Sequence, residues 1–338
     1  MIFITAILKE GRQMKKLFSR RSSIPHPFWV IVNKEVGDQV RSWRFIILLL
    51  LIALTCFGSL YTSVSNLAKS IKPDDPAGSF LFLKLFTLSD GSLPPFHVFI
   101  GFLSPLLGIA LGFDAINAEQ NGGTLSRIMS QPIHRDYIIN AKFVAALIVI
   151  STLFFSLGFL TIGLGLIIIG IPPTAEEFLR IIFFLVLSVL YVAFWLNLSI
   201  LFSIRFKQAA TSALTAIAAW LFFTIFYQII ISLIAKAIVP ADLASEQQAI
   251  HYQELLMNLL RAVPSQLYSD ATTTLLMPAV RSLGPLTMEQ IYGAIPNPLP
   301  LGQSLLLVWP QLTGLIAATV LCFALSYYSF MKKEIRSR

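Results

Sequence analysis

The chain has 338 residues, of which 56% are hydrophobic and only 12% are charged, and its mean hydropathy is +0.76. A soluble domain carries about 25% charged residues, so this composition excludes one and predicts an all-α polytopic membrane protein. The net charge of +8 would suggest a nucleic-acid partner for a soluble protein. In a membrane protein it sets orientation instead, so we expect no nucleic acid as a partner.

Residues 1–44 are predicted to form a cytoplasmic arm followed by an amphipathic helix at the membrane surface. Between 28 and 44, apolar residues recur at helical spacing and polar residues lie opposite. Tryptophans at both ends suit the headgroup region, so we expect contact with membrane lipid. The alternative is a soluble helix that packs on a partner. The interfacial face is assigned to Trp29, Val32, Val36, Val40 and Trp43.

Residues 45–338 are predicted to form a six-helix transmembrane domain, because six apolar runs are long enough to cross about 30 Å of hydrocarbon. Of the 25 basic residues, 18 fall on the side that holds both termini, which predicts cytoplasmic termini in a plasma or inner membrane. The spacers 67–95 and 237–302 would then face outward. The six runs are 45–66, 96–117, 143–171, 178–203, 208–236 and 303–331.

The second run carries small residues at spacings of three or four, which gives it a smooth face for close helix packing. We favour packing within one chain over a subunit interface, and we expect a kink at the proline. The face comprises Gly101, Pro105, Gly108, Gly112 and Ala115.

The interval 114–142 combines charge, paired glycines and a proline between two membrane spans. Gly122 and Gly123 permit a tight turn, and Thr124 is expected to cap a short helix over 125–130 that ends before Pro132. A compact helix across the ends of two spans is a surface through which another protein can transmit movement to those spans. We therefore interpret it as a coupling element. The alternative is a solvated basic loop.

This interval resembles the signature loop of ABC-2 type exporter permeases, which read Asp-x-Ile-x-x-Glu-x-x-x-Gly-Thr-Leu, then Pro-Ile/Val-x-Arg, then Gly/Ala-Lys. The matching residues are Asp114, Ile116, Glu119, Gly123, Thr124, Leu125, Pro132, Ile133, Arg135 and Lys142. The resemblance implies that the loop docks on a separate ATPase subunit and that the helix at 28–44 is the family's elbow helix. The residues expected to couple to the ATPase are Asp114, Glu119, Gly122, Gly123, Thr124, Leu125, Arg127, Pro132, Arg135 and Lys142.

The fifth run contains one polar stripe in its outer half. Buried polar groups in lipid need partners, so the stripe is predicted to face the bundle or a transport pathway. Hydrogen bonding between helices without transport remains the alternative. The stripe comprises Thr224, Tyr227, Gln228 and Ser232.

The interval 237–302 resembles the outer loop of many prokaryotic ABC-2 permeases. Prolines divide it, so no piece is long enough to span a membrane, yet it presents a wide apolar face. We predict short helices that lie in the outer membrane interface and roof the exit as a lid, with a bend at Pro264. The lid residues are Tyr252, Leu256, Leu260, Pro264 and Leu267.

Catalytic and metal-binding motifs are missing from the sequence. It has no phosphate-binding Gly-x-x-x-x-Gly-Lys-Ser/Thr loop, its four histidines are scattered, and its two cysteines lie in apolar runs. We expect no enzyme activity and no bound cofactor or metal in this chain, with ATP and magnesium on a partner subunit.

The interpretation is therefore a permease subunit of an ATP-driven ABC exporter, paired with a second copy or a paralogue and with cytoplasmic ATPase subunits. The resemblance covers nearly the whole chain but not the extension before Pro25. One alternative is a signalling or scaffold subunit of an ABC-type complex that moves no solute. A second is an ion-coupled secondary transporter, which the absence of a mid-span carboxylate disfavours.

Overall fold

The computed structural model describes residues 26–70, 80–89, 91–238, 246–283 and 298–333, and within these ranges the ordered structure is helical, without strands. Six of its segments are long and apolar enough to cross a membrane, which confirms the predicted number of spans. The six are Trp43–Leu67, Phe96–Asn121, Arg135–Ile169, Ala175–Arg205, Ala209–Ile238 and Leu301–Lys332.

The helices follow one another in chain order. The first half of the described chain contains α2 (Pro27–Val40), α3 (Trp43–Ser70), α4 (Leu81–Thr87), α5 (Phe96–Gly112), α6 (Asn117–Asn121), α7 (Thr124–Met129) and α8 (Arg135–Ile169). The second half contains α9 (Ala175–Arg205), α10 (Ala209–Leu221), the π-helix η2 (Phe222–Phe226), α11 (Tyr227–Ile238), α12 (Glu246–Leu260), α13 (Pro264–Leu276) and α15 (Leu301–Lys332).

Helix α9 forms the centre of the bundle and packs against α5, α8, α10, α13 and α15. Its contact with α5 is close, because α5 presents glycines there. A Cβ added to Gly108 would lie 2.8 Å from the carbonyl oxygen of Val192, and one added to Gly112 would lie 2.9 Å from that of Leu196. The small-residue face of α5 therefore packs within the chain, as predicted.

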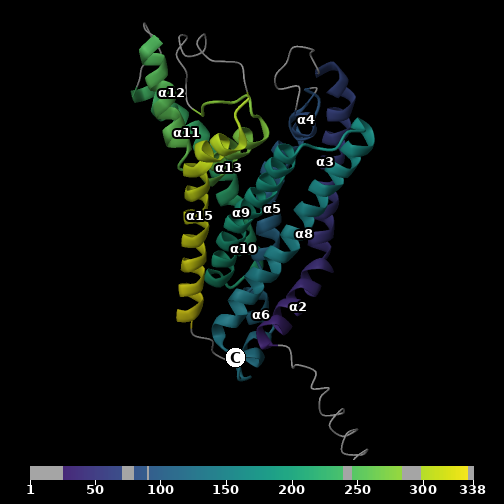
Figure 1. Ribbon diagram of the computed structural model, residues 1–338. Coiled ribbons are helices and arrows are strands. Elements are labelled where there is room, and N and C mark those ends of the chain that lie inside the picture. Colours follow the sequence, from purple (N-terminus) through teal and green to yellow (C-terminus); the bar gives the residue numbers. More distant parts are fainter. Residues whose placement is uncertain (1–25, 71–79, 90, 239–245, 284–297, 334–338) are drawn as a thin grey trace, which may run out of the picture.

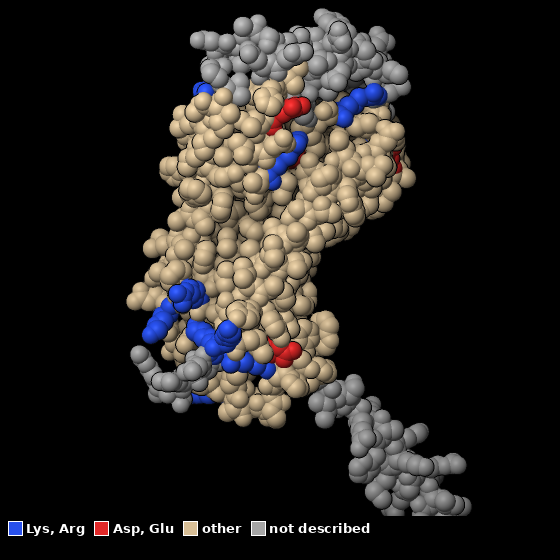
Figure 2. Space-filling model, turned by 90° about the vertical axis from the view of Figure 1, so that its left-hand side faces the viewer, with Lys and Arg blue, Asp and Glu red and all other residues tan. Residues whose placement is uncertain are grey.

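Different helices lie at the two ends of the bundle (Figure 1). At one end lie α6, the start of α2 and the end of α15, and Lys and Arg side chains gather there in the view from the side of α15 (Figure 2). We call this the basic end. Helices α4, α12 and α13 lie at the opposite end, which we call the α13 end. Both ends of the described chain, at the start of α2 and the end of α15, therefore lie at the basic end (Figure 1).

The predicted outer loop contains α12 and α13, and α13 is largely buried at its end of the bundle, where it packs against α9 and α15. Tyr268 stacks on Tyr191 of α9 with ring centroids 4.4 Å apart, and its hydroxyl lies 2.8 Å from Ser188 Oγ. Pro264 is buried at the first position of α13 and marks the predicted bend. The other four lid residues, Tyr252, Leu256, Leu260 and Leu267, are half-buried.

At the α13 end, a buried arginine forms hydrogen bonds to several segments of the chain. It was not identified from the sequence. Arg180 is fully buried one turn into α9 and pairs with Glu176 at 2.8 Å. Its other donors reach the backbone oxygens of Leu275 at 3.1 Å and Leu299 at 2.6 Å. Since one guanidinium offers five donors in a fixed plane, this single side chain joins α9 to α13 and to the start of α15.

The elbow helix differs from its predicted extent. The helix expected over 28–44 is divided at Ser42, whose Oγ accepts a hydrogen bond from Phe45 N at 3.3 Å. Trp43, assigned to the interfacial face, is therefore the first residue of α3. A serine hydroxyl at this position satisfies a free amide at the start of the new helix, which explains why the chain restarts there.

Candidate functional site

The connection between α5 and α8 leaves the bundle at a point fixed by α9. Ile116 N and Asn117 N both donate to Ser203 Oγ, at 2.9 and 3.2 Å. Ser203 is fully buried near the end of α9. One hydroxyl thus accepts hydrogen bonds from the two amides at the start of α6, and this fixes the start of the short helix against α9.

Gly123 is the residue that lets α7 begin. Its φ of +69° lies in the left-handed region, and it precedes the first helical residue. A side chain there would cost about 1–2 kcal/mol in backbone strain. The prediction that Thr124 caps the helix is wrong, because Thr124 is already within α7 and its hydroxyl donates to Glu119 O at 3.2 Å. Leu125 is 1% exposed and anchors α7 in the main core.

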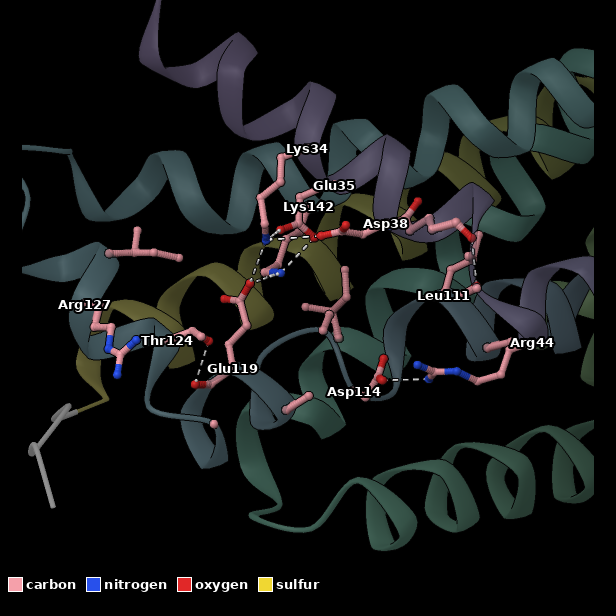
Figure 3. A pocket seen from close by; sticks show the side chains of 18 residues that line it. Lys34, Glu35, Asp38, Arg44, Leu111, Asp114, Glu119, Thr124, Arg127 and Lys142 are labelled. Carbon is pink, nitrogen blue, oxygen red and sulfur yellow. Dashed lines mark hydrogen bonds and ion pairs between the residues drawn. The ribbon is translucent and has the colours of Figure 1, made fainter.

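Near α7, two carboxylates share one buried lysine (Figure 3). Lys142 Nζ of α8 lies 2.8 Å from Glu119 Oε1 of α6 and 2.9 Å from Glu35 Oε2 of α2. Lys34 approaches the same pair, at 3.0 Å from Glu35 Oε1 and 3.7 Å from Glu119 Oε1. Two cations and two anions therefore alternate and join three helices.

The pKa values of this cluster follow from its pairing. Burial alone would raise the pKa of Glu35, but Lys142 and Lys34 outweigh it and hold that pKa below its ordinary value of 4.5. Burial would lower the pKa of Lys34, but Glu35 and Glu119 outweigh it and raise that pKa above 10.5. Both groups are thus charged at neutral pH, as an ionic connection requires.

A second ionic contact ties the end of α5 to the start of α3. Arg44 Nη1 lies 2.6 Å from Asp114 Oδ2, and the Arg44 guanidinium lies 4.9 Å from the ring centroid of Phe113. The pair lies beside a cavity of about 550 Å³ that extends from the Glu35–Lys142 cluster to α5 (Figure 3). The first span is therefore connected to the same loop as the elbow helix.

The third connection reaches the last span. Arg135 begins α8, and its Nη2 donates to the backbone oxygens of Phe330, at 2.6 Å, and of Lys333. Its guanidinium also lies 5.1 Å from the ring centroid of Phe330. Because the last carbonyls of a helix lack partners within the helix, Arg135 satisfies the end of α15.

The remaining predicted coupling residues form the outer surface of this loop. Gly122, Gly123, Thr124, Arg127 and Pro132 are all exposed. Within the described part of the chain, Arg127 has no carboxylate partner. The loop therefore has an inner set of residues fixed to four helices and an outer face open to another molecule.

Comparison with known proteins shows the family of the chain. Residues 29–335 match the family described as ABC-2 family transporter protein. The chain belongs to the ABC-2 family. It is 25% identical over 205 residues to the probable ABC transporter permease protein NosY of Pseudomonas aeruginosa, which covers 60% of this chain and 68% of that protein. It is 24% identical over 204 residues to the NosY protein of Stutzerimonas stutzeri, with the same coverage. The ABC-2 chain is accordingly a transmembrane ABC permease subunit.

The interfacial residues of this ABC-2 permease divide between two environments. Val32 is fully buried against Ala141 and Ala145 of α8. Val36 is half-buried, whereas Trp29 and Val40 are about half exposed, and Trp43 in α3 is 78% exposed. The buried face of α2 also contains Glu35, which the sequence reading placed in no role. Its spacing of three from Val32 was the available signal, since residues three apart share a helix face.

Within the described part of the chain, the predicted polar stripe forms one side-chain hydrogen bond to another helix. Tyr227 Oη donates to Leu259 O of α12 at 2.8 Å, and Ser232 Oγ bonds within its own helix to Ile229 O. Gln228 is exposed, and Thr224 is half-buried in the π-helix η2. The stripe's place on a transport pathway stays a prediction.

Proposed function

We propose that this ABC-2 permease is the membrane subunit of an ATP-driven exporter, and that a separate ATPase subunit docks on the exposed face of α7. ATP and magnesium would bind to that subunit. The basic end would face the cytoplasm with both termini, since basic residues are retained on that side. The α13 end would then face outward.

The observation that carries the proposal is the pairing of an exposed outer face with inner ionic contacts. A force on α7 would reach α2 and α8 through Glu119 and Lys142, which are 2.8 Å apart. It would reach α3 through Asp114 and α15 through Arg135. Closure of the ATPase subunits could therefore move several spans as rigid bodies.

A second permease, either a copy or a paralogue, is the partner we propose within the membrane. The fifth span supports this, because only 11% of its most apolar stretch is buried, whereas 67% is buried in α9. Large apolar side chains are exposed along it, including Leu214 at 68% and Leu233 at 61%. Lipid or a second permease would cover this face.

The experiment that tests the proposal is purification of the permease with its ATPase after Arg127→Glu. We expect the reversed charge to weaken co-purification and to reduce stimulation of ATP hydrolysis. The fold should be preserved, because Arg127 is exposed and pairs with no carboxylate of the described residues. Arg41→Glu makes the same change of charge at an exposed position of the α2–α3 turn and serves as the control. Undiminished binding and stimulation in the Arg127 variant would refute the docking site.

The scaffold alternative makes use of the same docking face, so a separate measurement distinguishes it. An exporter hydrolyses ATP faster when its solute is present, and it moves that solute across a sealed vesicle. A scaffold subunit would bind the ATPase equally well and show neither effect.

A further inference from the structure

A groove at the basic end lies apart from the α6–α7 loop. It occupies about 580 Å³ between the last turns of α9 and α15. Leu201 and Phe202 of α9 and Tyr328 of α15 supply apolar surface, and Arg205, Lys332 and Lys333 supply positive charge. Both helices cross the membrane and end here, so the groove lies at the depth of lipid headgroups.

Among the residues that the structure describes, none that lines the groove carries a carboxylate to balance these cations. Lys333 Nζ donates to Ile204 O at 2.5 Å, and the Lys332 ammonium lies 4.5 Å from the ring centroid of Tyr328. Burial and the nearby charge of Lys207 lower the pKa of Lys333. Positive charges held this closely repel one another, so an anion in the groove would stabilise them.

An apolar stripe leads from the groove along the outer face of α15. Leu321, Leu325 and Tyr328 lie at helical spacing on one face and are 63%, 55% and 57% exposed. Such a stripe beside a basic groove matches a molecule with a negative head and a long apolar tail. A free anion would use only the groove, and an acidic protein segment would not use the stripe.

We propose that the groove binds the phosphate of an anionic phospholipid and that an acyl chain of the same lipid lies along the α15 stripe. Arg205 would contact the phosphate through two parallel hydrogen bonds, and Lys332 would add charge from the facing helix. Lys333 would keep its hydrogen bond to Ile204 O. It would attract the phosphate through its positive charge without direct contact.

The last turn of α15 both lines this groove and accepts hydrogen bonds from Arg135. The carbonyls of Phe330 and Lys333 that accept from Arg135 belong to the same last turn of α15. A lipid that holds the ends of α9 and α15 together would therefore stabilise the anchor of the α6–α7 loop. This inference does not depend on the proposed ATPase docking.

The test uses the purified full-length permease in detergent, with bound dioleoyl phosphatidylglycerol and phosphatidylcholine counted by native mass spectrometry. We expect preference for phosphatidylglycerol, and the double variant Arg205→Gln, Lys332→Gln should weaken its binding by about 30-fold, since each basic residue near a surface contributes a factor of about five. Arg41→Gln, an exposed arginine outside the groove, should leave binding unchanged.

Three results would overturn the proposal. Equal binding of phosphatidylglycerol to the double variant and the parent, both with unchanged thermal unfolding, would show that the groove is not the site. Full displacement by millimolar inorganic phosphate would show a site for a free anion. Loss of ATPase co-purification with lipid binding intact would assign the cations to a protein partner.

A second variant applies if the double variant unfolds. Leu325→Gln, which alters only the stripe, should still lower phosphatidylglycerol binding. Unchanged binding would contradict the acyl-chain contact.

Discussion

Lys142 Nζ lies 2.9 Å from Glu35 Oε2, so the third span and the elbow helix are joined by an ion pair in which both side chains are at most 10% exposed. The same ammonium reaches Glu119 of the signature loop at 2.8 Å. A lysine that serves two carboxylates from different helices fixes their relative positions. Movement of the loop must either carry the elbow helix with it or break a buried contact.

Replacing Lys142 with methionine tests the importance of this contact for the fold. The substitution leaves Glu35 and Glu119 close together and without their shared buried cation, so we expect a loss of about 3–5 kcal/mol in stability, seen as a lower unfolding temperature. Lys34→Met is the control. Because the Lys34 side chain is 54% exposed, its replacement should reduce stability far less. Equal effects of the two substitutions would contradict this account. Adding Glu35→Gln to Lys142→Met should restore part of the loss.

The pH dependence of stability follows from the lowered pKa of Glu35. An acid whose pKa is depressed by folding stabilises the protein above its unfolded value, near 4.5, and loses that contribution as pH falls through the folded value. Lys34, with a raised pKa, contributes below about 10.5 and loses its contribution as pH rises further. We therefore expect the difference in unfolding temperature between the parent and Glu35→Gln to be constant from about pH 6 to 9 and to shrink below pH 4.5.

Asp38→Asn, which removes a 65% exposed carboxylate from the same helix, controls for the general effect of charge in that experiment. A difference between parent and Glu35→Gln that persists undiminished at pH 3.5 would show that the ion pair is not its source.

The sequence could predict the six spans and the small-residue face of α5 because both depend on local patterns of hydrophobicity and residue size. It also singled out the interval 114–142, in which Glu119 and Lys142 lie 2.8 Å apart. The role of this interval in ATPase coupling stays a prediction. The sequence could not show that Glu35 and Lys142 meet, because they are far apart in the chain and their pairing depends on how α2 crosses α8. Arg180 was missed for the same reason, since its acceptors are backbone oxygens of α13 and of the chain before α15. The prediction that Thr124 caps α7 was wrong because the left-handed Gly123 occupies the cap position, and Thr124 is the first residue of the helix.

Gly108→Ala tests the contact between α5 and α9. The added Cβ would lie 2.8 Å from Val192 O and 2.9 Å from Leu196 N, both backbone atoms that cannot move aside. We expect a loss of about 1–3 kcal/mol in stability. Gly163→Ala in α8 is the matched control, because its Cβ would meet nothing within 4 Å and should stabilise the helix by about 0.5–1 kcal/mol. Similar effects of the two alanines would mean that α5 and α9 are not in close contact.

The proposed orientation is tested by labelling single cysteines with a reagent that does not cross membranes. Ser269 in α13 and Ser130 after α7 are both exposed and lie near opposite ends of the bundle, so each can carry the probe without disturbing the core. The two native cysteines lie within spans and are replaced by serine beforehand. Intact cells should label Ser269→Cys at once and Ser130→Cys only after the membrane is permeabilised, since the basic end is expected inside. Labelling in the reverse order would place the signature loop outside the cell, where no cytoplasmic ATPase could reach α7, and would overturn the proposed docking along with the orientation.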